Sequence, residues 1–505
     1  MNANAAQLLW DAAARHGRRP AIFAEGIEAD HRSLAIRAGT IASALTQAGL
    51  RPGDRVGIFL DRGIGAAAAF FGTLAAGAVA VIVNESQRPR QIEQCLAHAG
   101  AGVLLTDAAA LMRLHRPLTG AFVTLDLNDL GAEGGAAILP TPRAGDDPAQ
   151  IVFTSGSTGA PKGVTVTHAN LRAAAGTVTD YLGILPSDRI AGLMSFSSVY
   201  GMSQLLCTIR SGATLVVERS TLPRSVVTTL ARERVTVVAA VPPLWLRLLE
   251  AGGLRETPLP ALRVITNAGG HLPVEAVRAL RLAQPAARLF LMYGLTEVLR
   301  STFLPPEEVD RHPDSIGRAM PGAEVYVVDE AGHPVVPGMV GELVHRGPTV
   351  TNGYWGDPAL TAQVFRPLPG ITGPGERAVF SGDLVRQDGE GLLYHVSRRD
   401  RLIKTMGHRV GPDEVVDVLI ASGELAEGEV VAEADATWGS RIVAHVVLAS
   451  AGTLARLRTF AARELPRHMQ PARYVVHAAL PLLASGKHDV AALAAPPPAV
   501  VEATS

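Results

Sequence analysis

From residue 33 to about residue 300, helical stretches alternate with short strands rich in β-branched residues. Parallel strands need long connections, usually helices, so this alternation predicts an α/β fold with largely parallel sheets. The span is long enough for two such layered subdomains. The first helix is expected at 33–50, and strands are expected at 56–60, 102–105, 150–154, 190–193, 214–217, 236–239, 262–265 and 288–291.

A run of 22 uncharged residues between Arg62 and Glu85 is long enough to cross a bilayer. The run is mostly Ala and Gly, which insert weakly, and Gly77 divides it. We therefore expect a buried helix at 64–76 that ends at this glycine, followed by a buried parallel strand at 78–83. No membrane insertion is expected.

After about residue 320 the pattern changes to short strands separated by Gly/Pro turns, which predicts a small β-rich unit. A new section begins at Asp400, with helices near 413–421 and 453–464 and strands at 428–432 and 441–448. The expected organisation is a large N-terminal domain (1–399), a small α+β C-terminal domain (400–495) and a disordered tail (496–505).

Charge and cysteine content narrow the function classes. The 505 residues carry a net charge of −1, so neither a nucleic acid nor an anionic membrane is an expected partner. Two cysteines, Cys95 and Cys207, are too few for a disulfide framework. No signal-peptide pattern begins the sequence, and a cytoplasmic location is expected.

The segment 151–168, IVFTSGSTGAPKGVTVTH, has the pattern of a phosphate-binding loop. A short apolar run predicts a strand, and the small residues that follow allow backbone N–H groups to approach an anion. Hydroxyl groups add donors, and Lys162 adds a compact charge. No Ser or Thr follows this lysine, so the loop is not a Walker motif.

Lysine is rare in this chain. Of 46 Lys and Arg residues, only Lys162, Lys404 and Lys487 are lysines. Arginine is planar and almost never neutral, whereas lysine is a compact charge on a flexible stem. Positions that keep lysine are therefore candidates for chemistry that arginine cannot perform, unless they are chance survivors at neutral sites.

Four motifs occur in order: TSGSTGAPKG (154–163), YGLTE (293–297), SGDL (381–384) and PLLASGK (481–487). Together they resemble the adenylate-forming superfamily of acyl-CoA synthetases, amino-acid adenylation domains and luciferases. The resemblance covers essentially the whole chain. It implies a large domain and a mobile C-terminal domain, which activate a carboxylic acid with ATP and Mg²⁺ and pass the acyl group to a thiol. All three lysines lie in or beside these motifs.

The resemblance implies a role for each motif residue. Thr296 would contact the α-phosphate, Glu297 would bind Mg²⁺, and Lys487 would reach the substrate carboxylate and the α-phosphate. Asp383 would bind the ribose hydroxyls with Arg398 as its helper, and Asp400 would be the hinge. The remaining ATP-binding residues, for the β- and γ-phosphates and then the adenine side, would be Thr154, Ser155, Gly156, Ser157, Thr158, Gly159, Lys162, Gly269, Gly270, His271, Tyr293 and Gly294.

Each residue also has a plainer interpretation. Glu297 is alternatively a surface residue in the first turn of a helix, and His271 a turn residue. Asp383 alone fits an ordinary Gly-Asp turn. Lys487 alone fits a solvated turn, and Lys404 is either a residue that enters the site in one domain orientation or a structural lysine.

The acyl pocket is expected after strand 190–193, at Ser197, Ser198, Val199 and Tyr200, and near the 240–246 turn. Amino-acid-activating relatives usually place an Asp at about the position of Val199 to pair with the substrate ammonium, so an ordinary α-amino acid is not expected. Arg300 anchors a polar group or a second carboxylate, or else it is a salt-bridged helix residue.

The expected function is an AMP-forming carboxylate–thiol ligase that makes an acyl-AMP and then an acyl-CoA. The alternative is a stand-alone adenylation enzyme that loads an acyl group or a non-standard amino acid onto the phosphopantetheine of a carrier protein acting in trans. The run 293–325 is similar to acyl-CoA ligases associated with exosortase systems. Neither the acid nor the choice of acceptor follows from the sequence.

Overall fold

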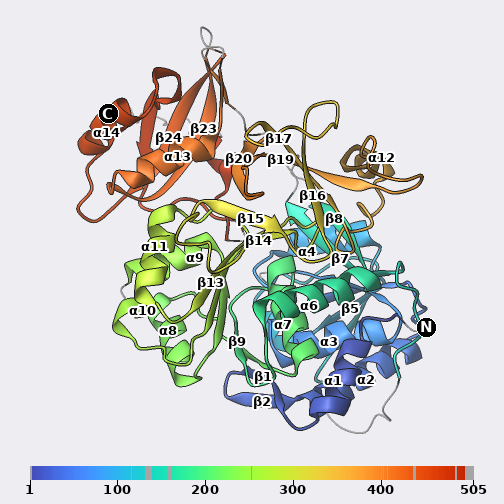
Figure 1. The fold of residues 1–505 in the computed structure, drawn as a ribbon. Coiled ribbons are helices and arrows are strands. Elements are labelled where there is room, and N and C mark those ends of the chain that lie inside the picture. Colours follow the sequence, from blue (N-terminus) through green and yellow to red (C-terminus); the bar gives the residue numbers. More distant parts are fainter. Residues whose placement is uncertain are drawn as a thin grey trace, which may run out of the picture.

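The computed structural model describes residues 3–494 except 115, 131–138, 156–160, 252, 400, 402, 406–407, 436–438 and 484–485. Figure 1 shows a large N-terminal part and a smaller C-terminal part, coloured orange to red, that packs against one end of it. This arrangement confirms the predicted mixed α/β fold with two parts of unequal size.

The first sheet is parallel except for its last pair, β7 and β8, which is antiparallel. Its inner strands are buried, apart from half-buried Arg55 at the start of β3, as expected for a parallel sheet covered on both faces. Its order among the described residues is β6 (Val123–Asp126), β5 (Val103–Thr106), β3 (Arg55–Phe59), β4 (Val79–Ile82), β7 (Pro148–Ser155) and β8 (Pro161–Thr167).

The uncharged run forms the predicted helix and strand. Helix α3 (Ile64–Ala75) is followed by β4, and it packs closely on α2 (His31–Gln47), where Asp30 caps the N-terminus. A side chain at Gly72 would come within 2.7 Å of the Ala38 carbonyl oxygen, so glycine permits this close approach. Within the described chain, no helix combines the length and the apolarity that a membrane span requires.

The second sheet has a parallel centre with β2 (Ile27–Asp30) as an antiparallel edge. Strand β12 begins at Val264, two residues later than the sequence predicted. Arg263, just before it, pairs with Asp188. The parallel strands, in spatial order, are β13 (Arg288–Tyr293), β12 (Val264–Asn267), β11 (Val237–Ala240), β9 (Arg189–Gly192), β10 (Thr214–Val217) and β1 (Pro20–Ala24).

Helices connect these strands and fill the space between the two sheets. One hydrophobic cluster joins α3, α6 and α7 with strands of both sheets. The helices, besides α2 and α3, are α1 (Gln7–His16), α4 (Pro89–Ala99), α5 (Ala108–Met112), α6 (His168–Leu182), α7 (Val199–Ser211), α8 (Pro223–Arg232), α9 (Pro242–Glu250), α10 (Gly253–Glu256) and α11 (Val274–Ala283).

The predicted β-rich unit exists, but it continues the second sheet instead of forming a separate one. The antiparallel strands β14 and β15 carry the ladder from β13 to β20. Its elements are β14 (Thr302–Leu304), β15 (Ser315–Ala319), β16 (Glu324–Val328), β17 (Val340–Arg346), α12 (Pro358–Val364), β18 (Phe365–Arg366), β19 (Ala378–Gln387) and β20 (Leu393–Arg398).

The C-terminal part has its own hydrophobic cluster, built from α13, α14 and the strands they cover. The predicted helices and strands of this part are confirmed. Its elements are β21 (Ile403–Thr405), β22 (His408–Val410), α13 (Pro412–Ala421), β23 (Leu425–Asp435), β24 (Gly439–Leu448), α14 (Leu454–Glu464), a 3₁₀ turn (Arg467–Met469), β25 (Arg473–Val476) and α15 (Val490–Ala494).

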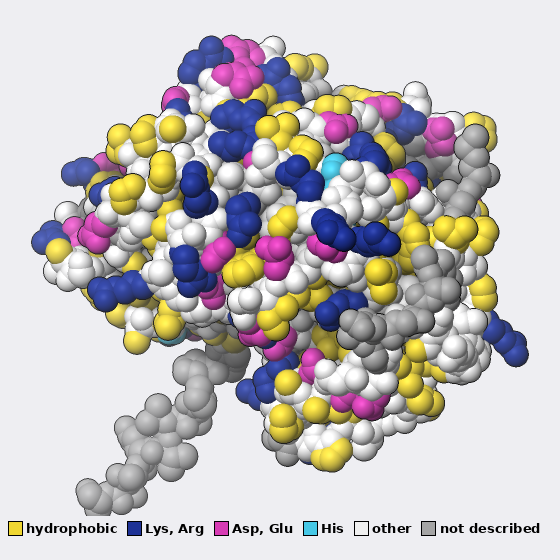
Figure 2. Space-filling model, turned by 90° about the horizontal axis from the view of Figure 1, so that it is seen from below, with side chains coloured by type: hydrophobic (Ala, Val, Ile, Leu, Met, Phe, Trp, Pro, Cys, Tyr) yellow, Lys and Arg dark blue, Asp and Glu magenta, His cyan; other side chains and the backbone are white. Residues whose placement is uncertain are grey.

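The face of the molecule that Figure 2 shows does not carry charges of only one sign. Basic, acidic and hydrophobic side chains are interspersed there. Mixed charges of this kind create little long-range field of one sign.

Candidate active site

The carboxyl ends of β12 and β13 lie at the same edge of the second sheet, where open α/β sheets bind ligands. The predicted adenine-side residues follow β12, and Tyr293 ends β13. Gly269 has φ +84, a left-handed conformation that suits glycine. The structure therefore brings the two predicted segments together.

Asp383 is buried on β19 among three polar side chains. Arg398 Nη1 lies 3.2 Å from its Oδ1, His395 Nε2 lies 3.6 Å from the same atom, and the Tyr293 hydroxyl donates to Oδ2. Burial alone would raise the pKa of Asp383, but His395 and Arg398 outweigh it, so the pKa is lowered. Asp383 is therefore a buried, ionised acceptor and not an exposed turn residue.

Glu297 lies in a turn after β13 and is half-buried, so it is not the first-turn helix residue of the alternative interpretation. The Tyr354 hydroxyl donates to its Oε1 over 2.6 Å. Burial and the Glu297 charge raise the pKa of Tyr354, which keeps the phenol protonated as a donor. A fixed carboxylate oxygen is a ligand that suits a hard cation such as Mg²⁺, so this side chain fits the predicted metal role. Thr296 is half-buried in the same turn.

The predicted phosphate loop joins β7 to β8. Thr154 and Lys162 face each other across this antiparallel pair, and Lys162 is half-buried. Gly156, Ser157, Thr158 and Gly159 lie outside the described residues, as does the side chain of Ser155. Their predicted phosphate contacts stay predictions.

Lys487 belongs to the C-terminal part and lies near enough to Asp383, Arg398 and Glu297 for their charges to act on its pKa. Its side chain is accessible to solvent but has protein on most sides, and this desolvation lowers its pKa. The charges of Asp383 and Glu297 oppose that shift. The neighbouring Gly486 lies against Val241, since a Cβ added there would be 3.8 Å from Val241 Cγ2. The C-terminal lysine thus reaches the same site as the nucleotide-side carboxylates.

Polar contacts hold the C-terminal part in this position. His271 Nε2 lies 3.0 Å from Asp417 Oδ1 on α13. Burial lowers the pKa of His271, but Asp417 together with Asp413 and Asp314 outweighs this effect, so the pKa is raised and the pair with Asp417 is favoured as an ion pair. His395 Nδ1 also lies 3.7 Å from Asp413 Oδ2 on the same helix. His271 is therefore an interdomain contact in this structure.

The structure describes only some of the residues around the predicted hinge. Asp400 lies outside the described residues, and so does the side chain of Lys404, whose backbone pairs with Arg409 in the β21–β22 hairpin. Arg401, next to the hinge position, pairs with Glu429 on β23. Glu429 Oε2 also lies 3.2 Å from His488 Nδ1, adjacent to Lys487.

The predicted acyl-pocket residues begin α7. The Ser198 hydroxyl caps the helix by accepting from the Gly201 N–H at 3.0 Å, and Val199 is the first helical residue. Ser197 Oγ accepts from Asn84 Nδ2 at 3.1 Å and lies 2.9 Å from Ser195 Oγ. Ser195 and Ser197 therefore belong to a polar cluster that also includes Asn84, which follows strand β4.

Tyr200 and Arg300 lie against each other. The guanidinium carbon of Arg300 is 4.9 Å from the centre of the Tyr200 ring, and the Tyr200 hydroxyl lies 2.6 Å from Thr266 Oγ1. Arg300 is in the loop before β14, and it forms no ion pair with a carboxylate among the described residues. It is therefore not the salt-bridged helix residue of the alternative interpretation.

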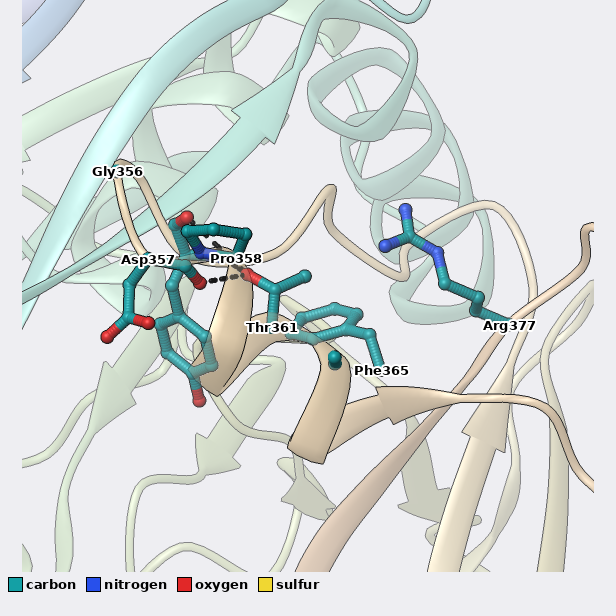
Figure 3. Close-up of a pocket in the computed structure, with 8 residues that line it drawn as sticks. Gly356, Asp357, Pro358, Thr361, Phe365 and Arg377 are labelled. Carbon is teal, nitrogen blue, oxygen red and sulfur yellow. Dashed lines mark hydrogen bonds between the residues drawn. The ribbon is translucent and has the colours of Figure 1, made fainter.

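A separate pocket of about 440 Å³ lies beside α12 (Figure 3). Thr361 bridges its wall, because its hydroxyl accepts from the Tyr354 N–H and donates to the Asp357 carbonyl. The pocket includes Tyr354, the residue that holds Glu297, but none of the predicted ATP or acyl residues lines it. It therefore borders the candidate site through one tyrosine.

Two family models match the chain. The model for AMP-binding enzymes covers residues 9–355, and the model for the AMP-binding enzyme C-terminal domain covers residues 414–487. The chain belongs to the AMP-binding enzyme family. Membership in the predicted adenylate-forming superfamily is thus confirmed, whereas the likeness to exosortase-associated ligases stays a prediction.

The curated proteins that this AMP-binding enzyme resembles include synthases and a ligase. The enzyme is 32% identical over 465 residues to tyrocidine synthase 3 of Brevibacillus parabrevis, covering 91% of this chain but 7% of that protein. The chain spans less than a tenth of each of the first three curated relatives. It is 31% identical over 514 residues to the L-proline–[L-prolyl-carrier protein] ligase of Streptomyces coelicolor, covering 95% and 94% of the two chains.

Among solved structures, o-succinylbenzoate CoA synthetase of Bacillus subtilis is similar, with a TM-score of 0.83 and 26% identity. The match covers 95% of this chain and 96% of that one, and that structure holds an acyl-adenylate intermediate. Another structure of the same synthetase holds ATP and a magnesium ion. The folds of these enzymes agree over nearly their whole length.

Several residues of this AMP-binding enzyme's candidate site were not identified from the sequence. They lie outside the four motifs: Tyr354 on the loop before α12, His395 on β20, Thr266 near the end of β12, Asn84 after β4, and Ser195 just before α7. A polar residue directly after a buried strand was a usable signal for Asn84. Nothing local marks Tyr354 or His395, whose contacts depend on the assembled fold.

Proposed function

We propose that this enzyme joins a carboxylic acid to a phosphopantetheine thiol in two half-reactions. The acid first attacks the α-phosphorus of ATP, which forms an acyl-AMP and releases pyrophosphate. The thiol then attacks the acyl carbon and displaces AMP. The observation that carries the proposal is that Lys487 from the C-terminal part lies near Asp383 and Glu297 of the N-terminal part, whose charges act on it.

The side chains suit the charges that adenylation develops. Lys487 would stabilise the carboxylate and the α-phosphate as they meet, and Asp383 with Arg398 would hold the ribose. Thr296 would contact the α-phosphate. Lys162, with the 154–159 loop, would hold the β- and γ-phosphates. Glu297 would hold Mg²⁺, which supplies charge neutralisation at the phosphates when bound.

The orientation of the two parts suits the first half-reaction. Lys487 lies near Asp383 and Glu297, and the His271–Asp417 pair holds α13 beside the adenine-side residues. In the second half-reaction the thiol would need to reach the acyl carbon near the position that Lys487 holds here. Rotation about the predicted hinge at Asp400 would therefore move Lys487 away before the second half-reaction. The proposed boundary between the moving parts is therefore 399/400.

An ordinary α-amino acid is a poor fit for the acyl side. Its ammonium would need a carboxylate near the 197–200 segment. Glu85 accepts from the Ser195 hydroxyl there, but it is already paired with Arg62, whose Nη1 lies 2.6 Å from Glu85 Oε1. The cluster thus offers hydroxyl and amide groups and a neutralised carboxylate.

Both sources of the thiol have support among similar proteins. The B. subtilis synthetase supports CoA, which we take as the leading acceptor. The S. coelicolor ligase supports the alternative acceptor, a carrier protein acting in trans. Because both present phosphopantetheine, the proposed chemistry is the same.

The test measures ATP-dependent pyrophosphate release over a panel of carboxylic acids with Mg²⁺. Active acids are then incubated with CoA or with a holo carrier protein, and the products are identified by mass spectrometry. An acyl-CoA supports the leading acceptor, and an acylated carrier supports the alternative. Failure of the protein to bind ATP would refute the enzymatic proposal.

A further inference from the structure

Arg300 is a buried cation that pairs with no carboxylate among the residues that the structure describes. Only 4% of its surface is exposed. Two of its nitrogens, Nε and Nη2, are buried and have no hydrogen-bond partner within the part of the chain that the structure describes. Arginine stays protonated in proteins, so burial here leaves an uncompensated charge that costs free energy.

Three titratable groups on which the guanidinium charge acts are neutral. Its charge acts on Tyr181, Tyr200 and Cys207. Burial raises the pKa of all three groups, that of Tyr200 to about 12, so none of them is an anion near neutral pH. The Tyr200 ring offers a cation–π contact, which is weaker than a paired anion.

The backbone holds Arg300 in place under strain. Leu299, the preceding residue, has φ +54, which is unfavourable for a branched side chain. The Thr349 hydroxyl donates to the Arg300 carbonyl over 3.1 Å, and Gly294 packs against the Arg300 Cα. Strain of this kind persists where the surrounding fold fixes a residue, often at binding sites.

The two unpaired nitrogens are chemically informative. Nε–H and Nη2–H lie on the same edge of a guanidinium, and this edge matches the two oxygens of a carboxylate. Tyr200, which Arg300 contacts, belongs to the predicted acyl pocket, and Glu297 lies only three residues before Arg300. The free edge therefore lies beside the acyl side of the site.

We propose that Arg300 binds a second carboxylate of the acid that the enzyme activates, so that the substrate is a dicarboxylic acid. The inference rests on the proposed adenylation function. One carboxylate of the substrate attacks ATP, and the other displaces the side chains packed over Nε and Nη2 and forms a two-point contact with these nitrogens. A substrate without this group leaves the buried charge unpaired, and such a site rejects it strongly.

The test compares matched acids that differ only in a terminal carboxylate or methyl group: succinate with butyrate, glutarate with valerate, and adipate with hexanoate. Pyrophosphate release should show a diacid preferred over its match by at least about 10²-fold in kcat/KM. Arg300→Gln should remove this preference, mainly by lowering the rate with the diacid, and Arg300→Lys should restore part of it. The matched control is Arg458→Gln, because Arg458 also stacks on a tyrosine, at 5.4 Å, but in the C-terminal part.

The outcomes separate the two proposals. Activation of monocarboxylic acids as good as that of diacids, or a preference that Arg300→Gln leaves unchanged, overturns the inference but leaves adenylation standing. If no acid releases pyrophosphate, the proposed function fails and the inference falls with it. If Arg300→Gln does not fold, the wild-type Tm decides: a rise with the diacid and ATP beyond that with its match supports the inference, and equal shifts overturn it.

Discussion

At the scale of single residues, the candidate site depends on charged groups whose partners come from distant parts of the chain. Asp383 is held by Tyr293 and Arg398, and Glu297 is held by Tyr354. Such partners fix the orientation of an acceptor before a ligand arrives, which is how binding sites reduce the entropy lost on binding.

Lys487→Ala should lower acid-dependent pyrophosphate release by about 10²–10³-fold, the scale of removing one donor to the transition state. Thiol transfer from supplied acyl-AMP should change much less, because Lys487 is proposed to act only in adenylation. Both half-reactions are measured on the same preparation. Equal losses in the two steps would contradict the assigned role.

Tyr354→Phe should raise the Mg²⁺ concentration required for activity and lower kcat about tenfold. The change removes a hydrogen bond to a charged carboxylate, typically worth about 1.5–3 kcal/mol. Titration of pyrophosphate release with Mg²⁺ measures the effect. Tyr326→Phe is the matched control, since the Tyr326 hydroxyl donates to exposed Glu324 over 2.6 Å on β16. The same shift in both variants would argue against a metal-linked role for Tyr354.

At the scale of elements, β23 links the hinge side of the C-terminal part to the lysine loop. Glu429 on β23 contacts Arg401 near the hinge and His488 beside Lys487. Glu427 also faces His488, at 3.8 Å. Burial lowers the pKa of His488, but the two carboxylates outweigh it and raise the pKa to about 9. The histidine is thus an imidazolium that ties the loop to the strand.

His488 should make stability depend on pH. Its pKa is higher in the folded state than the ordinary value of 6.5, so the stabilisation is complete below about pH 6.5 and is lost as pH rises through about 9. The difference in free energy of unfolding between wild type and His488→Gln should be on the order of 2 kcal/mol at pH 6.

Urea unfolding at pH 6, 8 and 10 measures that difference. His333→Gln, at an exposed histidine 4.0 Å from Asp329, should show no comparable pH dependence. A difference for His488→Gln that stays constant from pH 6 to pH 10 would exclude the proposed ion pair as its cause.

The elements were largely predictable from the sequence, and the partners of the site residues were not. Helix α3 and strand β4 could be predicted because the uncharged run marks buried segments and Gly77 marks the end of the helix, and both signals are local in the sequence. The contact of Tyr354 with Glu297 joins residues 57 positions apart, and only the assembled sheet brings them together. Likewise, the sequence placed Arg300 near the site but could not show that its Nε and Nη2 have no hydrogen-bond partner among the described residues.

At the scale of the whole molecule, the described contacts between the two parts include the pairs of His271 with Asp417 and of His395 with Asp413, which suits an interface proposed to open. Exposed ion pairs contribute little, typically up to about 1 kcal/mol each. The His271–Asp417 pair is only partly exposed, but it faces the interdomain boundary. A small change there should therefore shift the balance between domain orientations without unfolding either part.

Asp417→Asn should slow adenylation by about threefold to fivefold, because it removes one ion pair from the orientation that places Lys487 in the cleft. Transfer to the thiol from supplied acyl-AMP should be unchanged or faster. Single-turnover measurements of each half-reaction test this. Asp310→Asn, which disrupts a surface pair with Arg281, is the control. Slowing of both steps by Asp417→Asn would show that the contact does not select one orientation.

The position of Lys487 also has a practical consequence. Its lowered pKa increases the fraction of free amine, and its side chain remains accessible from the cleft. Because the chain has only three lysines, reagents that acylate amines have few other side chains to modify. An activated ester carrying a fluorophore would therefore place a label close to the site of chemistry, and occupancy of the cleft by nucleotide would compete with labelling. The scarcity of lysine makes this protein suited to site-directed labelling without any engineered cysteine.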